Sequence, residues 1–177
     1  MATTPVSTAR LNALDELYLH LDREEDPWSV QLELRLEGSI DDVRFENAVR
    51  EAALRHPMAR ARLADIRGTD VRYRWEIFDD LDDGHVEVVD CGSEADIAQV
   101  RERLYSASPR LDRPGPFAIV LAHHPEGDAV MLNLHHAAGD GISTVRLMGS
   151  ILRAYAGEED PLPGVDPLAV RDAPEMG

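Results

Sequence analysis

The chain has 177 residues, of which 34 are acidic and 18 basic, and its formal net charge is −16 at pH 7. An acidic surface repels nucleic acid and anionic membranes, so this charge argues against both as partners. The length suits a single domain, or one half of a larger two-lobed protein.

The sequence also indicates the cellular location of the protein. The N-terminal stretch MATTPVSTARLNALDEL lacks the basic and apolar regions of a secretory signal. No apolar run approaches the roughly 18 residues that a membrane span needs. We therefore expect a soluble, cytoplasmic protein without a transmembrane segment. Its single cysteine, Cys91, excludes an intramolecular disulfide.

Periodic apolar residues predict the elements of the first half of the chain. Helical spacing predicts an amphipathic helix over residues 11–21, and strict alternation predicts a half-buried strand over residues 30–37. An acidic start predicts a helix from Asp41 to about His56, just before a proline. A second alternating strand is predicted over residues 71–78. The first helix is expected to bury Leu11, Leu14, Tyr18 and Leu21.

The second half of the chain continues this alternation of strands and helices. Residues 85–90 form a short predicted strand, and a serine-capped helix follows over residues 94–105. Two apolar strands, residues 117–124 and 129–136, are separated by the turn sequence PEGD, and helical spacing resumes over residues 142–155. The order of elements predicts an α/β or α+β layered fold, with helices packed on a mixed sheet.

The composition changes after Gly157. Residues 158–177 are rich in proline and acidic residues and show no periodicity, which is typical of a linker or hinge. We therefore expect a folded lobe over residues 1–157, followed by a linker over residues 158–177.

The pattern His-His-x-x-x-Asp occurs twice, and its first copy is His123, His124 and Asp128. Pro125 and Gly127 lie inside this copy, and this is the composition of a tight turn between two strands. Turn chemistry alone accounts for these residues. We therefore expect Asp128 to be an exposed turn residue and the first copy to have no catalytic role.

The second copy is His135, His136 and Asp140, and it leads into a helix instead of a hairpin. It stands at the C-terminal end of a strand, where open α/β sheets place their ligand sites. Because side chains alternate along a strand, His135 and His136 point to opposite faces, and only one of them can face a given pocket.

Three other interpretations of the second copy stay open on the residues alone. Asp140 can be the N-cap of the following helix and nothing more. His136 can be a buried, hydrogen-bonded core residue. The two can also be metal ligands four residues apart, although Gly139 and Gly141 disfavour the helix that this needs and no third ligand is evident nearby.

The segment HHAAGDG resembles the His-His-x-x-x-Asp-Gly motif of acyltransferases with the chloramphenicol-acetyltransferase fold. This superfamily includes the condensation domains of peptide synthetases and the bacterial wax ester synthase/diacylglycerol acyltransferases. LNALDELYLHLDREEDPWSV resembles the opening helix and loop of the wax ester synthase group, to which the likeness is closest. ALRHPMARARL resembles a helix-to-strand segment that ends in spaced arginines, and LDRPGPFAIVL resembles the stretch before the catalytic hairpin. The resemblance covers most of Leu11–Asp166 and implies one half-domain, the N-terminal lobe.

The resemblance implies a role for each motif residue. His136 would be the general base that takes a proton from an alcohol or amine as this group attacks an acyl thioester, a task that suits an imidazole. Asp140 would be architectural and paired with Arg62, with Arg60 as the alternative partner. Gly141 would allow close approach of the backbone at the start of the helix. The expected catalytic site thus comprises His135, His136, Asp140 and Gly141.

The implied reaction is transfer of an acyl group from a CoA or carrier-protein thioester to a hydroxyl, without a metal or other cofactor. Amide-forming condensation, as on a peptide synthetase, is the alternative within the same chemistry. A non-catalytic lobe that serves as an interaction module, or a plain α/β domain, are alternatives of other classes. Besides the thioester donor and the alcohol acceptor, the expected partner is a second acyltransferase lobe or a second copy of the chain.

Overall fold

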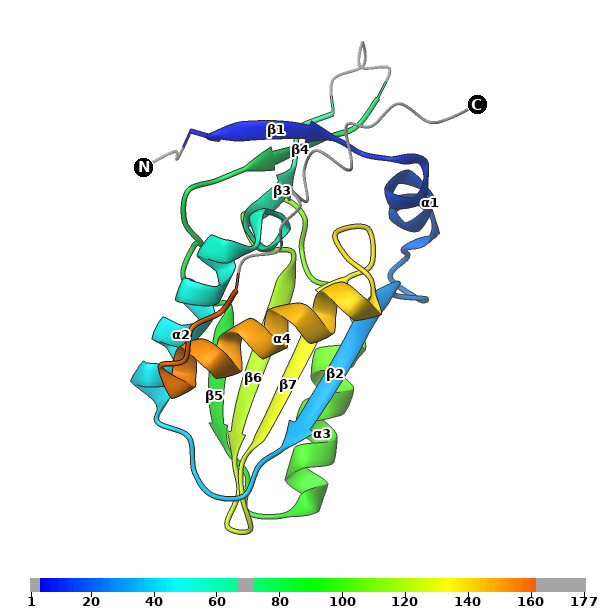
Figure 1. The fold of residues 1–177 in the computed structure, drawn as a ribbon. Helices are drawn as coiled ribbons and strands as arrows, with labels where there is room; N and C mark the ends of the chain where they lie inside the picture. The colour runs from blue at the N-terminus through cyan, green and yellow to red at the C-terminus, as the bar shows by residue number, and fades with distance from the viewer. Residues whose placement is uncertain (1–3, 67–71, 162–177) are drawn as a thin grey trace.

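The larger of two sheets forms the centre of the molecule (Figure 1). The computed structural model describes residues 4–66 and 72–161. The four strands of this sheet lie in the order β2 (Ser29–Arg35), β7 (Ala129–His135), β6 (Phe117–His123) and β5 (Val86–Asp90). The β5–β6 pair is parallel and the other pairs are antiparallel, so the predicted mixed sheet is confirmed.

Helices cover both faces of this sheet (Figure 1). Helices α2 (Asp42–Arg55) and α4 (Gly141–Ala156) pack together on one face, and α3 (Glu94–Tyr105) lies on the other. Because the central strands β6 and β7 are covered twice, they are almost continuously apolar and buried. The alternation within β7 separates Leu132, which packs with α2 and α4, from Met131, which packs with Ile97 of α3.

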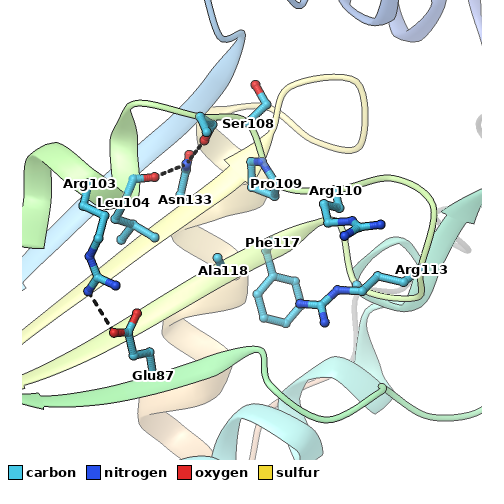
Figure 2. A pocket seen from close by; sticks show the side chains of 12 residues that line it. Glu87, Arg103, Leu104, Ser108, Pro109, Arg110, Arg113, Phe117, Ala118 and Asn133 are labelled. Atoms are coloured by element: carbon cyan, nitrogen blue, oxygen red, sulfur yellow. Dashed lines mark hydrogen bonds and ion pairs between the residues drawn. The ribbon is translucent and has the colours of Figure 1, made fainter. Parts of the chain in front are cut away.

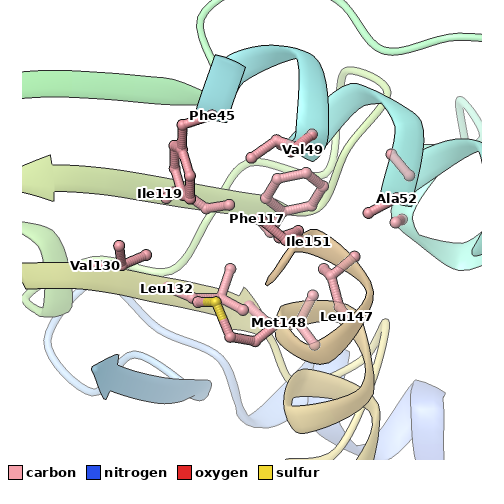
Figure 3. Packing of buried hydrophobic residues seen from close by; sticks show 14 of the residues in the cluster. Phe45, Val49, Ala52, Phe117, Ile119, Val130, Leu132, Leu147, Met148 and Ile151 are labelled. Atoms are coloured by element: carbon pink, nitrogen blue, oxygen red, sulfur yellow. The ribbon is translucent and has the colours of Figure 1, made fainter. Parts of the chain in front are cut away.

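The main core lies between the sheet and the α2–α4 layer (Figure 3). Helix α2 presents Phe45, Val49 and Ala52 at helical spacing, as predicted, and all three are buried. Buried residues of α4, Leu147, Met148 and Ile151, meet them over the surface of β6 and β7. Truncating such a side chain to alanine costs about 2–5 kcal/mol of stability, so these contacts hold α4 firmly on the sheet.

A second, smaller sheet of three antiparallel strands flanks one end of the first (Figure 1). Its order is β1 (Ser7–Arg10), β4 (Arg74–Ile77) and β3 (Ala61–Leu63), and a 3-10 helix, η1 (Pro57–Arg60), precedes β3. The strand predicted over residues 71–78 is confirmed in a shorter form as β4, whereas Val71 lies outside the described residues. Strand β1 was not predicted, because its sequence STAR has no apolar alternation.

Helix α1 (Ala13–Leu21) forms where predicted, and Leu11 and Tyr18 of the predicted apolar face pack in the smaller core cluster, but Leu14 does not. Leu14 is 54% exposed, whereas Asp15 is buried. Asp15 closes a capping box with Asn12 and accepts a hydrogen bond from the indole N–H of Trp75 at 3.4 Å. The prediction that Leu14 is buried was wrong. Asp15, and not Leu14, faces the interior, because its carboxylate has hydrogen-bond partners there.

The first His-His-x-x-x-Asp copy fixes the β6–β7 hairpin to the start of α2. The ring of His123 contacts Asp128 through Nδ1 at 2.9 Å and Asp42 through Nε2 at 2.7 Å. Asp128 also accepts the backbone N–H of Ile40 at 2.7 Å. The prediction that Asp128 is an exposed turn residue was wrong, since it is only 1% exposed. Its carboxylate is buried because it is the shared acceptor that joins three segments.

Two further observations concern possible membrane-spanning helices and the C-terminal end of the described fold. In the described ranges 4–66 and 72–161, no helix combines the length and apolarity that crossing a bilayer requires. Helix α4 ends at Gly157, whose left-handed backbone (φ 74°) closes it. Most of the predicted linker, residues 162–177, lies outside the described residues, so its role as a linker stays a prediction.

Replacing His123 with glutamine tests the hairpin anchor. Burial opposes the charge on this ring, but the hydrogen bonds to Asp42 and Asp128 outweigh it and raise the pKa of His123. The charged ring therefore adds stability below its unfolded pKa of about 6.5, and this stability is lost as the pH rises through the folded pKa. We expect His123→Gln to lower the free energy of unfolding by about 1–2 kcal/mol near pH 5.5, and by less near pH 9, in urea denaturation.

The matched control is His124→Gln at the neighbouring position. The ring of His124 accepts the backbone N–H of Glu126 at 3.2 Å, and no hydrogen bond joins it to a carboxylate in the described part of the chain. We expect its loss of stability to be small and similar at both pH values. A loss for His123→Gln that is the same at both pH values would contradict the charged anchor.

Candidate active site

The second copy of the motif lies where the central strand β7 ends and α4 begins. His135 is the last residue of β7, and Asp140 is the N-cap of α4. The backbone N–H of His136 donates to the carbonyl of Trp28 at 3.0 Å, so the β2–β7 pairing continues just past the strand. Ala137 and Ala138 are buried in the smaller core cluster. The motif therefore bridges the two parts of the fold.

His135 is a buried ring with both nitrogens engaged. Its Nδ1 accepts the backbone N–H of Ala137 at 3.1 Å, which leaves the proton on Nε2. Nε2 faces the carboxylate of Asp22 at 3.4 Å. Burial lowers the pKa of His135, and the nearby Asp22 opposes this effect only in part. His135 is thus a fixed structural group of the motif.

Asp22 contacts the motif, and the sequence did not reveal this contact. It lies directly after α1, and its Oδ1 accepts the backbone N–H of Trp28 at 2.8 Å and the hydroxyl of Ser108. Its other oxygen faces His135. One carboxylate therefore joins the end of α1, the start of β2, the loop after α3 and the motif. No local pattern marks it, because all of its partners are distant in sequence or belong to the backbone.

His136 is partly buried and held by an aromatic contact. Its ring stacks on the ring of Tyr18 in α1, with centroids 3.9 Å apart and planes inclined by 29°. Trp28 stacks in turn on Tyr18 at 5.7 Å. The Nδ1 atom of His136 is buried and has no hydrogen-bond partner among the described residues. Stacking, in place of a hydrogen bond at Nδ1, therefore sets the orientation of this imidazole.

These contacts extend the interpretation of Tyr18, which was expected only as part of an apolar helix stripe. Tyr18 and Trp28 both lie next to His136, with the Trp28 ring 6.3 Å from it and tilted by 48°. The position of Tyr18 one turn before the end of α1 was visible in the sequence, but its distant partner was not.

Asp140 caps the helix. Its Oδ1 accepts both the backbone N–H and the hydroxyl of Ser143, each at 2.8 Å. These hydrogen bonds lower the pKa of Asp140. The side chain is exposed, and no arginine forms an ion pair with it in the part of the chain that the structure describes. The structural interpretation of Asp140 as an N-cap therefore holds for this residue.

The predicted pairing of Arg62 with Asp140 was wrong. Arg62 donates to Glu76, its direct cross-strand partner on β4, with an Nε–Oε2 distance of 3.1 Å. The guanidinium of Arg60 donates to the carbonyl oxygens of Ala53 and Phe78. Both arginines belong to the smaller sheet or to η1, where nearer acceptors satisfy them before Asp140 can.

The close backbone approach expected at Gly141 occurs two residues earlier. A Cβ on Gly141 would meet no atom within 4 Å, whereas a Cβ on Gly139 would lie 2.9 Å from Leu134 and from Ser143. Gly139 is therefore the sterically required glycine of the motif loop. Gly141 is the first residue of α4, with open space beside it.

The metal interpretation of the motif gains no support from the geometry. Within residues 4–66 and 72–161, no group of three or more histidine, cysteine, aspartate or glutamate side chains is arranged to hold a metal ion. Asp140 accepts a hydrogen bond from Ser143, and the ring of His136 stacks on Tyr18.

Comparison with known proteins agrees with this arrangement. A family model described as "Condensation domain" matches residues 17–170. The protein Rv2305 of Mycobacterium tuberculosis is 41% identical over 157 residues, which are 89% of this chain and 35% of that protein. Tyrocidine synthase 3 of Brevibacillus parabrevis is 28% identical over 128 residues, which are 71% of this chain and 2% of that protein. The chain thus spans about a third or less of the length of these relatives.

The fold itself matches a solved structure. The condensation domain from the monacolin K polyketide synthase MokA superposes with a TM-score of 0.79 at 16% identity, covering 96% of this chain and 39% of that one. The predicted layered α/β fold is therefore confirmed. Since the family model matches most of the chain and a relative exceeds 40% identity, this protein belongs to the condensation-domain family.

Proposed function

We propose that this chain is the motif-bearing lobe of an acyltransferase in which His136 is the general base. The observation that carries the proposal is the state of the His136 imidazole. The ring is only partly buried, its orientation is set by Tyr18, and only its Nδ1 is enclosed. Nε2 is the nitrogen left to meet a substrate. A held imidazole with one accessible nitrogen is what general-base catalysis needs.

The proposed reaction moves an acyl group from a CoA or carrier-protein thioester to a hydroxyl. The hydroxyl oxygen attacks the thioester carbonyl as Nε2 of His136 takes its proton. The C–S bond then breaks, and His136 returns the proton to the thiolate leaving group, so that ester and thiol are the products. The N–H groups of Gly141 and Ile142, the first two residues of α4, lie next to the motif in the chain and can stabilise negative charge on the carbonyl oxygen.

An amine acceptor is the second candidate, and one observation favours it. Tyrocidine synthase 3, which matches 71% of this chain, is by name a synthase of tyrocidine, and the sequence resemblance already gave amide-forming condensation as the alternative. Amide formation would use the same base and the same proton path, with nitrogen in place of oxygen as the attacking atom. The choice between hydroxyl and amine is therefore a property of the acceptor site, and not of His136.

The expected partner is a second lobe or a second copy of this chain. The chain spans 35% of the length of Rv2305, so that relative has ample sequence for a further lobe. Ile142 and Val145 lie on the first turns of α4, next to the motif, and are 68% and 60% exposed. Exposed aliphatic side chains at this place suit a contact that encloses the site. If the lobe is instead a non-catalytic interaction module, this contact is its whole function.

Substitution at the two motif copies tests the assignment of the base. We expect His136→Ala to lower acyl transfer by about 10²–10⁴-fold, because proton removal from the acceptor loses its base. His124→Ala at the first copy should leave the rate unchanged. The measurement is thiol release from an acyl-CoA by the full protein, with alcohol and amine acceptors assayed side by side. Equal losses at both positions would refute the choice of the second copy.

The aromatic contact gives a separate prediction. Tyr18→Leu removes the ring that orients His136, and we expect kcat to fall about two- to tenfold with little change in KM. Tyr18→Phe keeps the ring and should retain most of the activity. A similar loss in both variants would mean that the hydroxyl of Tyr18, and not its stacked ring, is what matters.

A further inference from the structure

A hollow of about 270 Å³ lies on the α3 side of the large sheet, away from His136 (Figure 2). Its floor is formed by Phe117 and Ala118 of β6 and Asn133 of β7. The end of α3 and the loop that follows it form the wall. Neither histidine of the second copy lines it, so this hollow is distinct from the site proposed for acyl transfer.

The wall of the hollow is fixed by buried hydrogen bonds. The side-chain amide of Asn133 donates to the carbonyl oxygens of Leu104 at 2.8 Å and Ala107 at 2.9 Å (Figure 2). Its own oxygen is buried without a partner among the described residues, although Asn133 is only 1% exposed. At the other end, Gly115 lies so close to His85 that a Cβ would clash with the imidazole. The shape of the hollow is therefore set before any ligand arrives.

Three arginines surround this hollow in a protein whose net charge is −16. Arg103 pairs with Glu87 at 2.8 Å, and Arg110 pairs with Asp112; both pairs are well exposed. Exposed ion pairs contribute little, so an incoming anion can replace these partners at small cost. Arg113 donates only to the carbonyl of Gly84, at 3.4 Å, and forms no ion pair with any described carboxylate.

From this geometry we infer that the hollow binds a small carboxylate with a short apolar tail. Guanidinium groups bind carboxylate and phosphate oxygens through paired hydrogen bonds. The apolar part of the lining favours a carboxylate that carries an apolar tail over inorganic phosphate, which has none. Leu104, Ala107 and Ala118 offer an apolar surface for the tail. The volume lies just below the usual range for ligand pockets and limits the tail to a few carbons.

The hollow also contacts the network that holds the motif. Ser108 lines it, and the hydroxyl of Ser108 donates to Asp22, which in turn faces His135. Only the side chain of Ser108 would therefore separate a bound carboxylate from the carboxylate of Asp22. This inference does not depend on acyl transfer, because it concerns binding alone.

The test is an NMR titration of this chain with hexanoate, with hexan-1-ol and inorganic phosphate as comparison ligands. We expect hexanoate to shift the signals of Phe117 and Ala118 in a saturable manner, and the other two to bind more weakly. Arg113→Gln should weaken hexanoate binding about tenfold or more, because it removes a charge-assisted contact. Ala118→Leu should abolish binding by filling the floor while keeping every arginine.

Arg146→Gln is the matched control, since it removes an exposed arginine from α4 on the other side of the sheet. We expect it to leave hexanoate binding unchanged, and unchanged spectra without ligand will show that each variant is folded. The inference is overturned if hexanoate causes no saturable shift, or if Arg113→Gln binds as the parent does. It is also overturned if hexan-1-ol or phosphate binds as tightly as hexanoate.

Discussion

The carboxylate of Asp22 is the contact on which the geometry of the motif depends. It receives hydrogen bonds from Trp28 and Ser108 and faces the buried ring of His135. Asp22 is only partly buried, but one carboxylate that holds several partners joins these segments together. Tyr18 lies one turn earlier on the same helix and stacks on His136. Helix α1 thus positions both histidines, one through charge and one through an aromatic surface.

The two copies of His-His-x-x-x-Asp show how one pattern serves two purposes. In the first copy, His123 lies between two carboxylates, and its pKa is raised against the effect of burial. Such a ring is saturated with partners and is suited to holding a hairpin. In the second copy, His135 has the structural role, and this leaves His136 without a hydrogen-bonded side-chain partner among the described residues. The two adjacent rings thus differ in their contacts: His135 faces a carboxylate, and His136 is held by an aromatic stack.

The sequence predicted the parts of the fold whose signal is local. The bounds of α3 were predicted as observed, and β6 and β7 were visible as apolar runs, because periodicity over many residues is a strong signal. Contacts between distant segments were not predictable. Arg62 was assigned to Asp140, but the register of β3 on β4 places Glu76 directly opposite it. Asp128 was assigned to solvent, although Ile40 and His123 surround it.

Gly139 has a consequence for how this site can vary. No room exists for a methyl group between Leu134 and Ser143, and the two preceding alanines are buried. A larger side chain at Gly139 would therefore have to displace Leu134 or Ser143. The aromatic side chains that contact the ring of His136 come from outside this loop, from Tyr18 of α1 and from Trp28. The surroundings of this ring can therefore be altered through α1 without any change in the loop.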